Sequence, residues 1–198
     1  MFDRPPATDL STLSPRLIER CGVIELLVLD VDGVLTDGSI VIDDRGIEIK
    51  RFHVRDGGGI AAWLKAGKRI AILSARRSAA VEVRCRELGV ETVIQGADDK
   101  RGAIVGQSRA VGFAADRVCF MGDDLADLGA LEWSGLAICP ADAAAEAIAT
   151  ADYVTRLAGG RGAVREAIEL ILRVQGLWDA IVAGYRSPRG GEAFPDGS

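Results

Sequence analysis

The sequence predicts an α/β fold, a three-layer α/β/α sandwich with a parallel sheet at its centre. Short apolar runs of strand length recur along the 198 residues, and segments with helical spacing of apolar residues separate them. Continuous apolar runs of this kind are typical of strands buried on both faces of a parallel sheet. The alternation of strands and helices also favours right-handed crossovers, which place helices on both sides of the sheet.

The first strand is expected at residues 24–30, an apolar run that ends in Asp30. Four more apolar runs predict further strands, at residues 69–74, 92–95, 118–123 and 136–139. Helices are expected at residues 15–21, 59–66, 78–88, 100–111, 125–133, 144–150 and 163–175. In the last of these segments apolar residues recur at helical spacing, so one side of this helix should pack on the core.

A β-hairpin is expected directly after the first strand. Residues 39–42 and 47–54 flank Asp43-Asp44-Arg45-Gly46, which has the composition of a turn, and apolar and polar residues alternate over residues 47–50. An isolated two-stranded hairpin is only marginally stable in water. We therefore expect this hairpin insertion, residues 39–54, to lie in a subunit interface.

One domain is expected, over residues 23–176, because the length of the chain suits a single domain. A leader with its helix, residues 1–22, precedes this domain. After Gln175 the composition becomes that of a frayed segment, with Ser187-Pro188-Arg189-Gly190-Gly191. Residues 177–198 are therefore expected to form a flexible tail.

The composition excludes several classes of site. The single histidine, His53, cannot build a multi-histidine zinc site, and a Ser-His-Asp hydrolase would have to use it. The net charge of −5 is unfavourable for general nucleic-acid binding, so no nucleic-acid partner is expected. Residues 116–152 hold eight acidic residues and one basic residue, which indicates either a solvated face or a cation site.

The sequence predicts a cytoplasmic protein with no membrane partner. No apolar run reaches the roughly 18–20 residues that span a bilayer, and the first residues lack a signal-peptide pattern. The four cysteines are widely scattered, which is typical of free thiols in a reducing compartment.

Polar residues follow the expected strands at their carboxyl ends, where ligands bind in open α/β sheets. Asp30 ends the first strand, and Ser74 and Asp123 end two others. Lys100 begins a helix just after a further strand. Taken singly, Lys100 also suits a surface lysine, and Ser74 also suits a helix N-cap. Together these residues predict one polar site at this edge of the sheet.

The central motif is the segment Asp30-Val31-Asp32-Gly33. In an ideal strand, residues at positions i and i+2 lie on the same side. Asp32 comes after the end of the strand, where a turn at Gly33 can bring both acids toward one ligand. An EF-hand calcium loop is the rival interpretation, but here Val34 holds the fifth position and the glycine is fourth. A simple N-cap role for Asp32 is the other alternative.

This spacing suits phosphoryl transfer through a carboxylate. One aspartate attacks phosphorus, and a second protonates the leaving oxygen and then activates water. Because a carboxylate and a phosphate dianion repel each other, a cation must neutralise the pair, and Mg²⁺ suits an oxygen-rich site. Asp123-Asp124-x-x-Asp127 offers further oxygen ligands, Lys100 a positive charge and Ser74 a hydroxyl donor.

These pieces, in this order, resemble the four motifs of the haloacid dehalogenase-like phosphohydrolase superfamily, from about residue 25 to residue 175. The resemblance implies a Rossmann-like α/β/α fold. It makes Asp30 the nucleophile and Asp32 the general acid and base. The other implied site residues are Asp30, Asp123 and the backbone carbonyl of Asp32 around Mg²⁺, Ser74 and Lys100 around the phosphate, and Asp124 and Asp127 as outer, water-mediated partners.

The sequence is also similar to one cap-less family of that superfamily, the 3-deoxy-D-manno-octulosonate 8-phosphate (KDO 8-P) phosphatases of lipopolysaccharide-precursor synthesis. Only about 40 residues separate the first two motifs, too few for a cap domain. Residues 52–57, 81–85, 151–155 and 159–166 carry the similarity. It implies a homotetramer in which the hairpins meet, and in which a neighbour and the Gly-rich segment around Arg161 help to complete each active site.

The same resemblance implies a pocket for a phosphorylated sugar acid. Arginine side chains suit such a ligand because they grip a carboxylate through two parallel bonds. The residues implied to line the pocket are His53, Val54, Arg55, Asp56, Gly57, Arg76 and Arg84, beside Lys100. Simpler roles stay open for three of the residues: a satisfied hairpin residue for His53, a solvated helix face for Arg84 and a surface cation for Arg161.

Four positions depart from the pattern of the family, and they bear on the identity of the substrate. Ala75 stands where glycine is usual, and Ala61 stands where some relatives carry a basic residue. Ala144-Ala145 replaces a frequent His-Pro.

Three alternative functions stay open. The first is a sister phosphatase that acts on a nine-carbon nonulosonic or sialic acid 9-phosphate. The second is a receiver-type signalling module, which accepts a phosphate on aspartate but lacks a counterpart of Asp32. The third is a non-catalytic oligomerisation domain on the same fold, and the intact set of acidic and basic residues argues against it.

Overall fold

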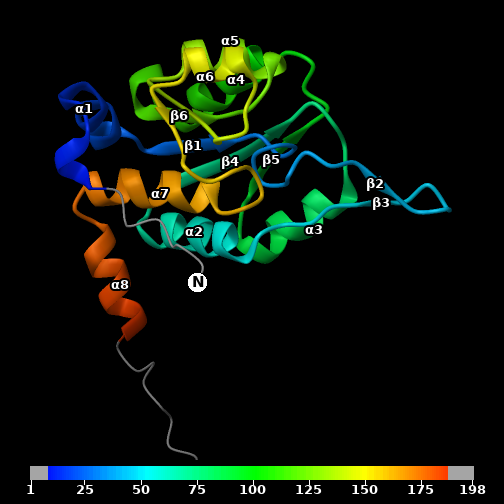
Figure 1. Cartoon of the computed structure of the whole chain (residues 1–198), viewed down its shortest axis with the longest axis horizontal. Helices are drawn as coiled ribbons and strands as arrows, with labels where there is room; N and C mark the ends of the chain where they lie inside the picture. The colour runs from blue at the N-terminus through cyan, green and yellow to red at the C-terminus, as the bar shows by residue number, and fades with distance from the viewer. Residues whose placement is uncertain (1–8, 187–198) are drawn as a thin grey trace, which may run out of the picture.

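The computed structural model describes residues 9–186, and it has the expected three-layer architecture (Figure 1). A parallel six-stranded sheet has the strand order β5-β4-β1-β6-β7-β8. Its strands are β1 (Leu26–Leu29), β4 (Arg69–Ser74), β5 (Thr92–Gln95), β6 (Val118–Met121), β7 (Leu136–Cys139) and β8 (Tyr153–Val154). The predicted α/β fold class is confirmed, and β8 is the one strand of this sheet that the sequence analysis missed.

Strand β1 lies at the centre of the sheet between β4 and β6. Leu29 at its end pairs with Ile72 on one side and with Met121 on the other. Because all strands run the same way, this register brings the loops after β1, β4 and β6 to one edge of the sheet. That edge carries the polar residues singled out in the sequence.

Alternate residues of β1 supply two apolar cores. Leu27 and Leu29 belong to the core beneath the helices α1 (Pro15–Val23), α2 (Val54–Lys65), α3 (Ala79–Leu88) and α7 (Ala163–Val174). Leu26 and Val28 belong to the core on the other face, beneath α4 (Lys100–Val111), α5 (Leu128–Trp133) and α6 (Ala145–Thr150). Both faces of the sheet are therefore covered, as the continuous apolar runs require.

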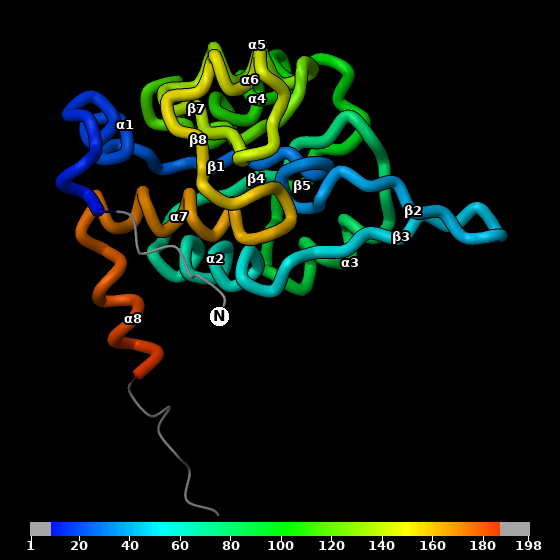
Figure 2. Tube along the Cα trace, viewed as in Figure 1, coloured from blue at the N-terminus to red at the C-terminus, as the bar shows by residue number. Residues whose placement is uncertain are grey.

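The hairpin insertion projects from the body of the molecule (Figure 2). Its strands β2 (Val41–Ile42) and β3 (Glu48–Ile49) are antiparallel, with Val41 opposite Ile49. The expected extension of the second strand to residue 54 is wrong, because His53 caps α2 and Val54 is already helical. For the same reason α2 begins five residues before the expected residue 59.

Short 3₁₀ helices complete the fold at η1 (Leu10–Thr12), η2 (Ala115–Arg117) and η3 (Leu125–Asp127). The last of these occupies the first turn of the helix expected at residues 125–133. The other expected helices agree with the structure to within one or two residues at each end.

The predicted flexible tail is wrong for its first part, because α8 (Trp178–Arg186) is a helix. Trp178 is buried, and the guanidinium groups of Arg165 and Arg173 lie 4.8 and 5.5 Å from the centre of its ring. This cation–π packing ties the helix to α7. The rest of the expected tail, residues 187–198, and the start of the expected leader, residues 1–8, lie outside the described residues.

Two further observations concern residues 9–186. None of the helices in this part of the chain is long and apolar enough to cross a membrane. The cysteines Cys21, Cys85, Cys119 and Cys139 are all buried free thiols.

Candidate active site

Three carboxylates meet at the carboxyl edge of the sheet: Asp30, Asp123 and Asp127. Asp30 follows β1, Asp123 follows β6, and Asp127 ends η3. One oxygen of each carboxylate lies within 4.8 Å of the others. The resemblance implies outer, water-mediated roles for Asp124 and Asp127; in the structure Asp127 lies beside the other two carboxylates and Asp124 is exposed.

The loop after β1 leaves space for Asp123 because residue 33 is a glycine. Gly33 has a φ of +86°, and a Cβ atom there would come within 1.9 Å of Oδ2 of Asp123. Any side chain at this position would push the carboxylate away from Asp30. The glycine of the central motif therefore has two roles, a left-handed turn and a close approach.

Asp127 is held in place by donors on two elements. Its Oδ2 accepts hydrogen bonds from the backbone N–H groups of Asp123 and Asp124, at 3.0 and 3.2 Å. Its Oδ1 accepts a hydrogen bond of 2.6 Å from Lys100 Nζ. Asp127 therefore fixes both the loop that carries Asp123 and the lysine that faces Asp30.

Lys100 is a buried residue, with only 5% of its surface exposed, so the surface-lysine alternative is wrong. Its Nζ lies 2.9 Å from Oδ1 of Asp30. Burial opposes the charged form of the ammonium, but the carboxylates of Asp30 and Asp127 outweigh it and raise the pKa of Lys100. A permanent positive charge therefore stands beside the proposed nucleophile.

The carboxylate cluster carries more negative charge than Lys100 can balance. Burial, and then the charge of Asp127, raises the pKa of Asp30. Burial, and then the charge of Asp30, raises the pKa of Asp123 to about 7. Such crowded carboxylates favour a bound cation, and an all-oxygen donor set suits Mg²⁺.

Asp32 is surrounded by charged side chains from the hairpin and from the loop after β4. Its Oδ1 accepts a short hydrogen bond from Lys50 Nζ, and Arg76 Nε lies 3.7 Å from its Oδ2. Glu48 pairs with both Lys50 and Arg76. The alternation over residues 47–50 places Glu48 of β3 and Lys50 just after it on one face of the hairpin, but no sequence pattern indicates that this face meets Asp32.

Ser74 is buried at the end of β4, where its Oγ accepts a hydrogen bond of 3.2 Å from the backbone N–H of Arg76. The N-cap alternative for Ser74 is wrong, because α3 begins at Ala79 with Ser78 as its N-cap. Its hydroxyl lies at the same edge of the sheet as Asp30, one strand away.

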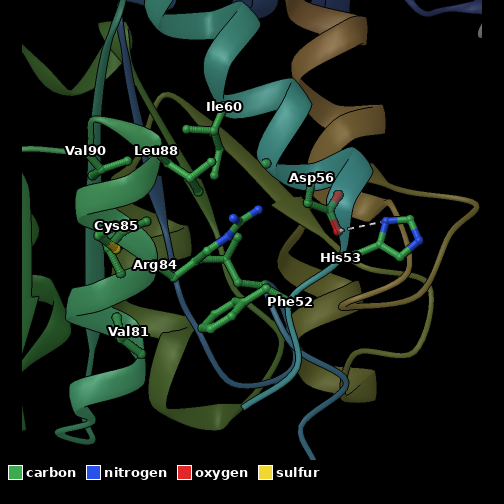
Figure 3. Close-up of a pocket in the computed structure, with 12 residues that line it drawn as sticks. Phe52, His53, Asp56, Ile60, Val81, Arg84, Cys85, Leu88 and Val90 are labelled. Carbon is green, nitrogen blue, oxygen red and sulfur yellow. Dashed lines mark ion pairs between the residues drawn. The ribbon is translucent and has the colours of Figure 1, made fainter.

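The residues expected to contact a substrate at the start of α2 have divergent environments. The side chain of Val54 is 81% exposed, and Arg55 is exposed as well. His53 is the N-cap of α2: its Nδ1 accepts a 3.3 Å hydrogen bond from the N–H of Arg55. The same nitrogen lies 3.9 Å from Oδ2 of Asp56 (Figure 3).

Asp56 is used inside the protein rather than in an open pocket. Its carboxylate is buried, and burial raises its pKa. Its two oxygens accept hydrogen bonds from the N–H groups of Gly162 and Arg165, at 3.1 and 2.8 Å. Asp56 therefore joins α2 to the start of α7, a contact that the sequence analysis missed.

Arg84 reaches from α3 toward α2 across a small, mainly apolar cavity of about 10 Å³ (Figure 3). A Cβ atom at Gly57 would come within 2.3 Å of its Nη2. One end of the guanidinium pairs with Glu87 at 3.1 Å, and its buried Nε has no hydrogen-bond partner among the described residues. The solvated-helix alternative for Arg84 is therefore wrong.

The Gly-rich segment before α7 packs against the loop that follows β1. A Cβ atom at Gly159 would lie 1.7 Å from the carbonyl oxygen of Gly33, so only glycine fits there. Arg161 Nη2 lies 3.2 Å from Oδ2 of Asp37, and Arg51 from the hairpin lies 3.3 Å from the same oxygen. Arg161 is thus a surface cation, and it pairs with Asp37 in the loop that follows β1.

Comparisons with known proteins agree with this geometry. A family model described as haloacid dehalogenase-like hydrolase matches residues 92–168. A 3-deoxy-D-manno-octulosonate 8-phosphate phosphatase, KdsC, of Salmonella typhimurium is 43% identical over 173 residues, which cover 87% of this chain and 92% of that protein.

Solved structures lead to the same group of proteins. The phosphatase of that name from Moraxella catarrhalis, in complex with magnesium ion, phosphate ion and KDO, has a TM-score of 0.84 at 40% identity and covers 85% of this chain and 97% of its own. The cobalt-bound form of the Haemophilus influenzae enzyme, YrbI, has a TM-score of 0.81 at 35% identity and covers 85% of this chain and 99% of its own.

Proposed function

This chain belongs to the haloacid dehalogenase-like hydrolases and, within them, to the 3-deoxy-D-manno-octulosonate 8-phosphate phosphatases, and on this premise we propose that it hydrolyses KDO 8-P to KDO and inorganic phosphate. The observation that carries the proposal is the cluster of Asp30, Asp123 and Asp127 with Lys100 at the carboxyl edge of the sheet. The proposed reaction belongs to the synthesis of lipopolysaccharide precursors.

The reaction has two steps on Asp30. In the first, a carboxylate oxygen of Asp30 attacks phosphorus, the ester P–O bond breaks, and Asp32 gives a proton to the sugar oxygen that leaves. In the second, Asp32 takes a proton from water, which attacks the aspartyl phosphate and releases phosphate. Lys100 and Ser74 bind phosphoryl oxygens, and the lysine charge offsets the repulsion between carboxylate and phosphate.

The cofactor is Mg²⁺, and the residues that would hold it are Asp30, the backbone carbonyl of Asp32, and Asp123. When bound, the ion supplies positive charge that neutralises the nucleophile and the phosphate. Asp127 positions Asp123 and Lys100, while Asp124 remains an outer partner. The crowded, electrically unbalanced carboxylates support this assignment.

The sugar acid is bound by cations and backbone at the mouth of the site. The proposed contacts are His53, Val54, Arg55, Asp56, Gly57, Arg76 and Arg84, with Arg161 from the Gly-rich segment. For Asp56 the structure supports a backbone or positioning contribution, since both of its carboxylate oxygens are already engaged. Residues 23–176 form the proposed catalytic domain.

We also propose a homotetramer assembled through the hairpins, and a cytoplasmic location. Five apolar side chains on and around the hairpin are between 41% and 59% exposed: Ile40, Val41, Ile42, Ile47 and Ile49. Exposed apolar surface of this density is typical of an interface. Four unpaired cysteines support a reducing compartment, which cell fractionation would check.

The experiment is the release of phosphate from KDO 8-P, measured with Mg²⁺ and after EDTA treatment, for the wild type and for Asp30→Asn. Asp116→Asn is the matched control, because this exposed aspartate lies before β6 at the opposite edge of the sheet. We expect the wild type and the control to be active in the presence of Mg²⁺ and inactive after EDTA treatment. Full activity of Asp30→Asn would overturn the assignment of the nucleophile.

The two other phosphate-handling interpretations are not favoured. Relatives that match most of the chain include KDO 8-P phosphatases, which supports the proposed substrate over a nine-carbon sugar acid or a signalling role. A comparison of kcat/KM on KDO 8-P and on a nine-carbon 9-phosphate decides the first, and a higher value for the nine-carbon substrate would reverse the choice. A long-lived aspartyl phosphate after treatment with acetyl phosphate would support the signalling module.

A further inference from the structure

Lys50 is a buried cation that has no role in the proposed reaction. Its side chain is only 2% exposed, although the neighbouring Ile49 is half exposed on the projecting hairpin. A buried ammonium is costly unless it is paired. Its partners are Asp32, through a short hydrogen bond to Oδ1, and Glu48, whose Oε1 lies 3.4 Å from Nζ.

The contact divides the two oxygens of Asp32 into different roles. Oδ1 accepts a hydrogen bond from Lys50, whereas within residues 9–186 no hydrogen bond reaches Oδ2, which has Arg76 Nε at 3.7 Å. A carboxylate anchored through one oxygen loses the freedom to rotate away from a reacting group. The other oxygen stays available to exchange a proton with the leaving group or with water.

The hairpin network makes this anchor rigid. Oε1 of Glu48 forms an ion pair with Lys50 Nζ at 3.4 Å and accepts a hydrogen bond from Nη2 of Arg76. Lys50 and Glu48 come from β3 and its end, Arg76 from the loop after β4, and Asp32 from the loop after β1. Three segments that are far apart in the sequence therefore converge on the side chain that the reaction needs to hold steady.

We propose that Lys50 is a positioning residue for Asp32, which holds Oδ1 so that Oδ2 is the oxygen that transfers the proton. This inference rests on the proposed function, because it takes Asp32 as the general acid and base. The simpler interpretation is a structural ion pair that holds the hairpin, and it predicts an equal loss of activity on every substrate. Substrates whose leaving groups differ in their need for a proton distinguish the two interpretations.

The test compares KDO 8-P with p-nitrophenyl phosphate in the presence of Mg²⁺. A sugar alkoxide leaves only with a proton, whereas p-nitrophenolate leaves without one, and kcat/KM reports the steps up to the transfer of the phosphoryl group to Asp30. We expect Lys50→Met to lower kcat/KM on KDO 8-P by about 30-fold or more, through kcat rather than KM. On p-nitrophenyl phosphate we expect a change of less than about threefold.

Two further variants serve as rescue and control. Lys50→Arg keeps a charged donor and should recover most of the loss on KDO 8-P. Lys68→Met removes another ion-paired and largely buried lysine, which bonds Glu25 and the carbonyl of Ile24. It should leave the ratio of the two kcat/KM values unchanged, whatever it does to stability.

Each outcome has a separate meaning. With an active wild type, equal losses on both substrates, or a rise in KM with kcat unchanged, would overturn the role of Lys50 and leave the proposed function intact. A wild type that does not turn over KDO 8-P with Mg²⁺ would overturn the proposed function and, with it, this inference.

Discussion

Asp123 shows how a residue can be placed for function at the expense of stability. It packs against Gly33 and faces Asp30, and burial with the charge of Asp30 raises its pKa to about 7. Without a cation, the folded protein therefore holds a proton at Asp123 that the unfolded chain releases near the ordinary aspartate pKa of 3.8. The site is built to be completed by an ion of opposite charge.

This proton sets a pH dependence for the metal-free protein. Between about pH 4 and pH 7 the folded state binds more protons than the unfolded state, so the free energy of unfolding falls as the pH rises through this window. We expect Asp123→Asn to stabilise the EDTA-treated protein at pH 8 by about 1–2 kcal/mol, after allowance for solvent screening. At pH 4 the gain should vanish.

Thermal and urea unfolding at both pH values would measure this effect. Asp116→Asn, at an exposed aspartate, is the control and should change little at either pH. A loss of stability for Asp123→Asn at pH 8 in the absence of metal would contradict the charge imbalance in the cluster.

Gly33 gives a second prediction at the same scale. Gly33→Ala forces a side chain into a left-handed backbone and onto the carboxylate of Asp123. Gly67 is the matched control, because its φ is +76° but no atom lies within 4 Å of a Cβ placed there. We expect both alanine variants to lose about 1–2 kcal/mol of stability from backbone strain.

Only Gly33→Ala should weaken the binding of Mg²⁺, by at least about tenfold, because only it displaces a ligand. Calorimetric titration of the metal-free proteins with Mg²⁺ measures this difference. Equal Mg²⁺ affinity in the two variants would show that the approach of Asp123 to Gly33 is not needed for the site.

At the scale of elements, boundaries are decided by side chains that the local pattern does not reveal. Five of the six strands of the main sheet follow from the apolar runs, since a strand buried on both faces must be apolar. Most helices follow from the spacing of their apolar residues. Helix α2 begins early because His53 caps it, and α8 forms because Trp178 packs under two arginines. Both depend on partners outside the element's own periodicity.

Asp56 joins two elements, and its removal should uncouple them. Its buried carboxylate accepts the N–H groups of Gly162 and Arg165 at the start of α7. We expect Asp56→Ala to cost about 2–4 kcal/mol, because two buried donors lose a charged acceptor. Asp99→Ala, which removes the exposed N-cap of α4, should cost only about 1 kcal/mol.

Urea unfolding gives the two free energies, and hydrogen exchange locates the effect. The amides of Gly162 and Arg165 should exchange faster in Asp56→Ala than in Asp99→Ala. Similar costs for both variants, with protected amides at the start of α7, would mean that Asp56 does not hold this helix.

At the scale of the whole molecule, the hairpin is the segment whose apolar side chains the single chain leaves uncovered. It projects from the body of the protein (Figure 1). Its apolar side chains are exposed, and Lys50 at its base pairs with Asp32. An assembly that covers the hairpin would therefore also order a segment that contacts the site.

The proposed tetramer predicts the behaviour of a hairpin variant. Val41 and Ile49 pair across the ladder, so Val41→Glu with Ile49→Glu places two like charges side by side on one face. We expect this double variant to be monomeric at micromolar concentration, by light scattering, where the wild type is a tetramer. Val83→Glu, at a half-exposed valine of α3, should keep the assembly of the wild type.

A wild type that is itself monomeric at that concentration would contradict the proposed assembly. A double variant that remains a tetramer would instead place the interface on another surface. Either result would leave the chemistry of the carboxylate cluster unchanged.

The sequence by itself determined the fold class and the residues at the edge of the sheet. The apolar runs before Asp30, Ser74 and Asp123 predict parallel strands with those ends together, and this arrangement predicts one polar site at that edge of the sheet. The tertiary structure decided how these residues are supported. Three contacts join segments that are distant in sequence: the hydrogen bond of Lys100 to Asp127, that of Lys50 to Asp32, and those of the start of α7 to Asp56. Such contacts depend on the paths of loops through space, and no local periodicity encodes those paths.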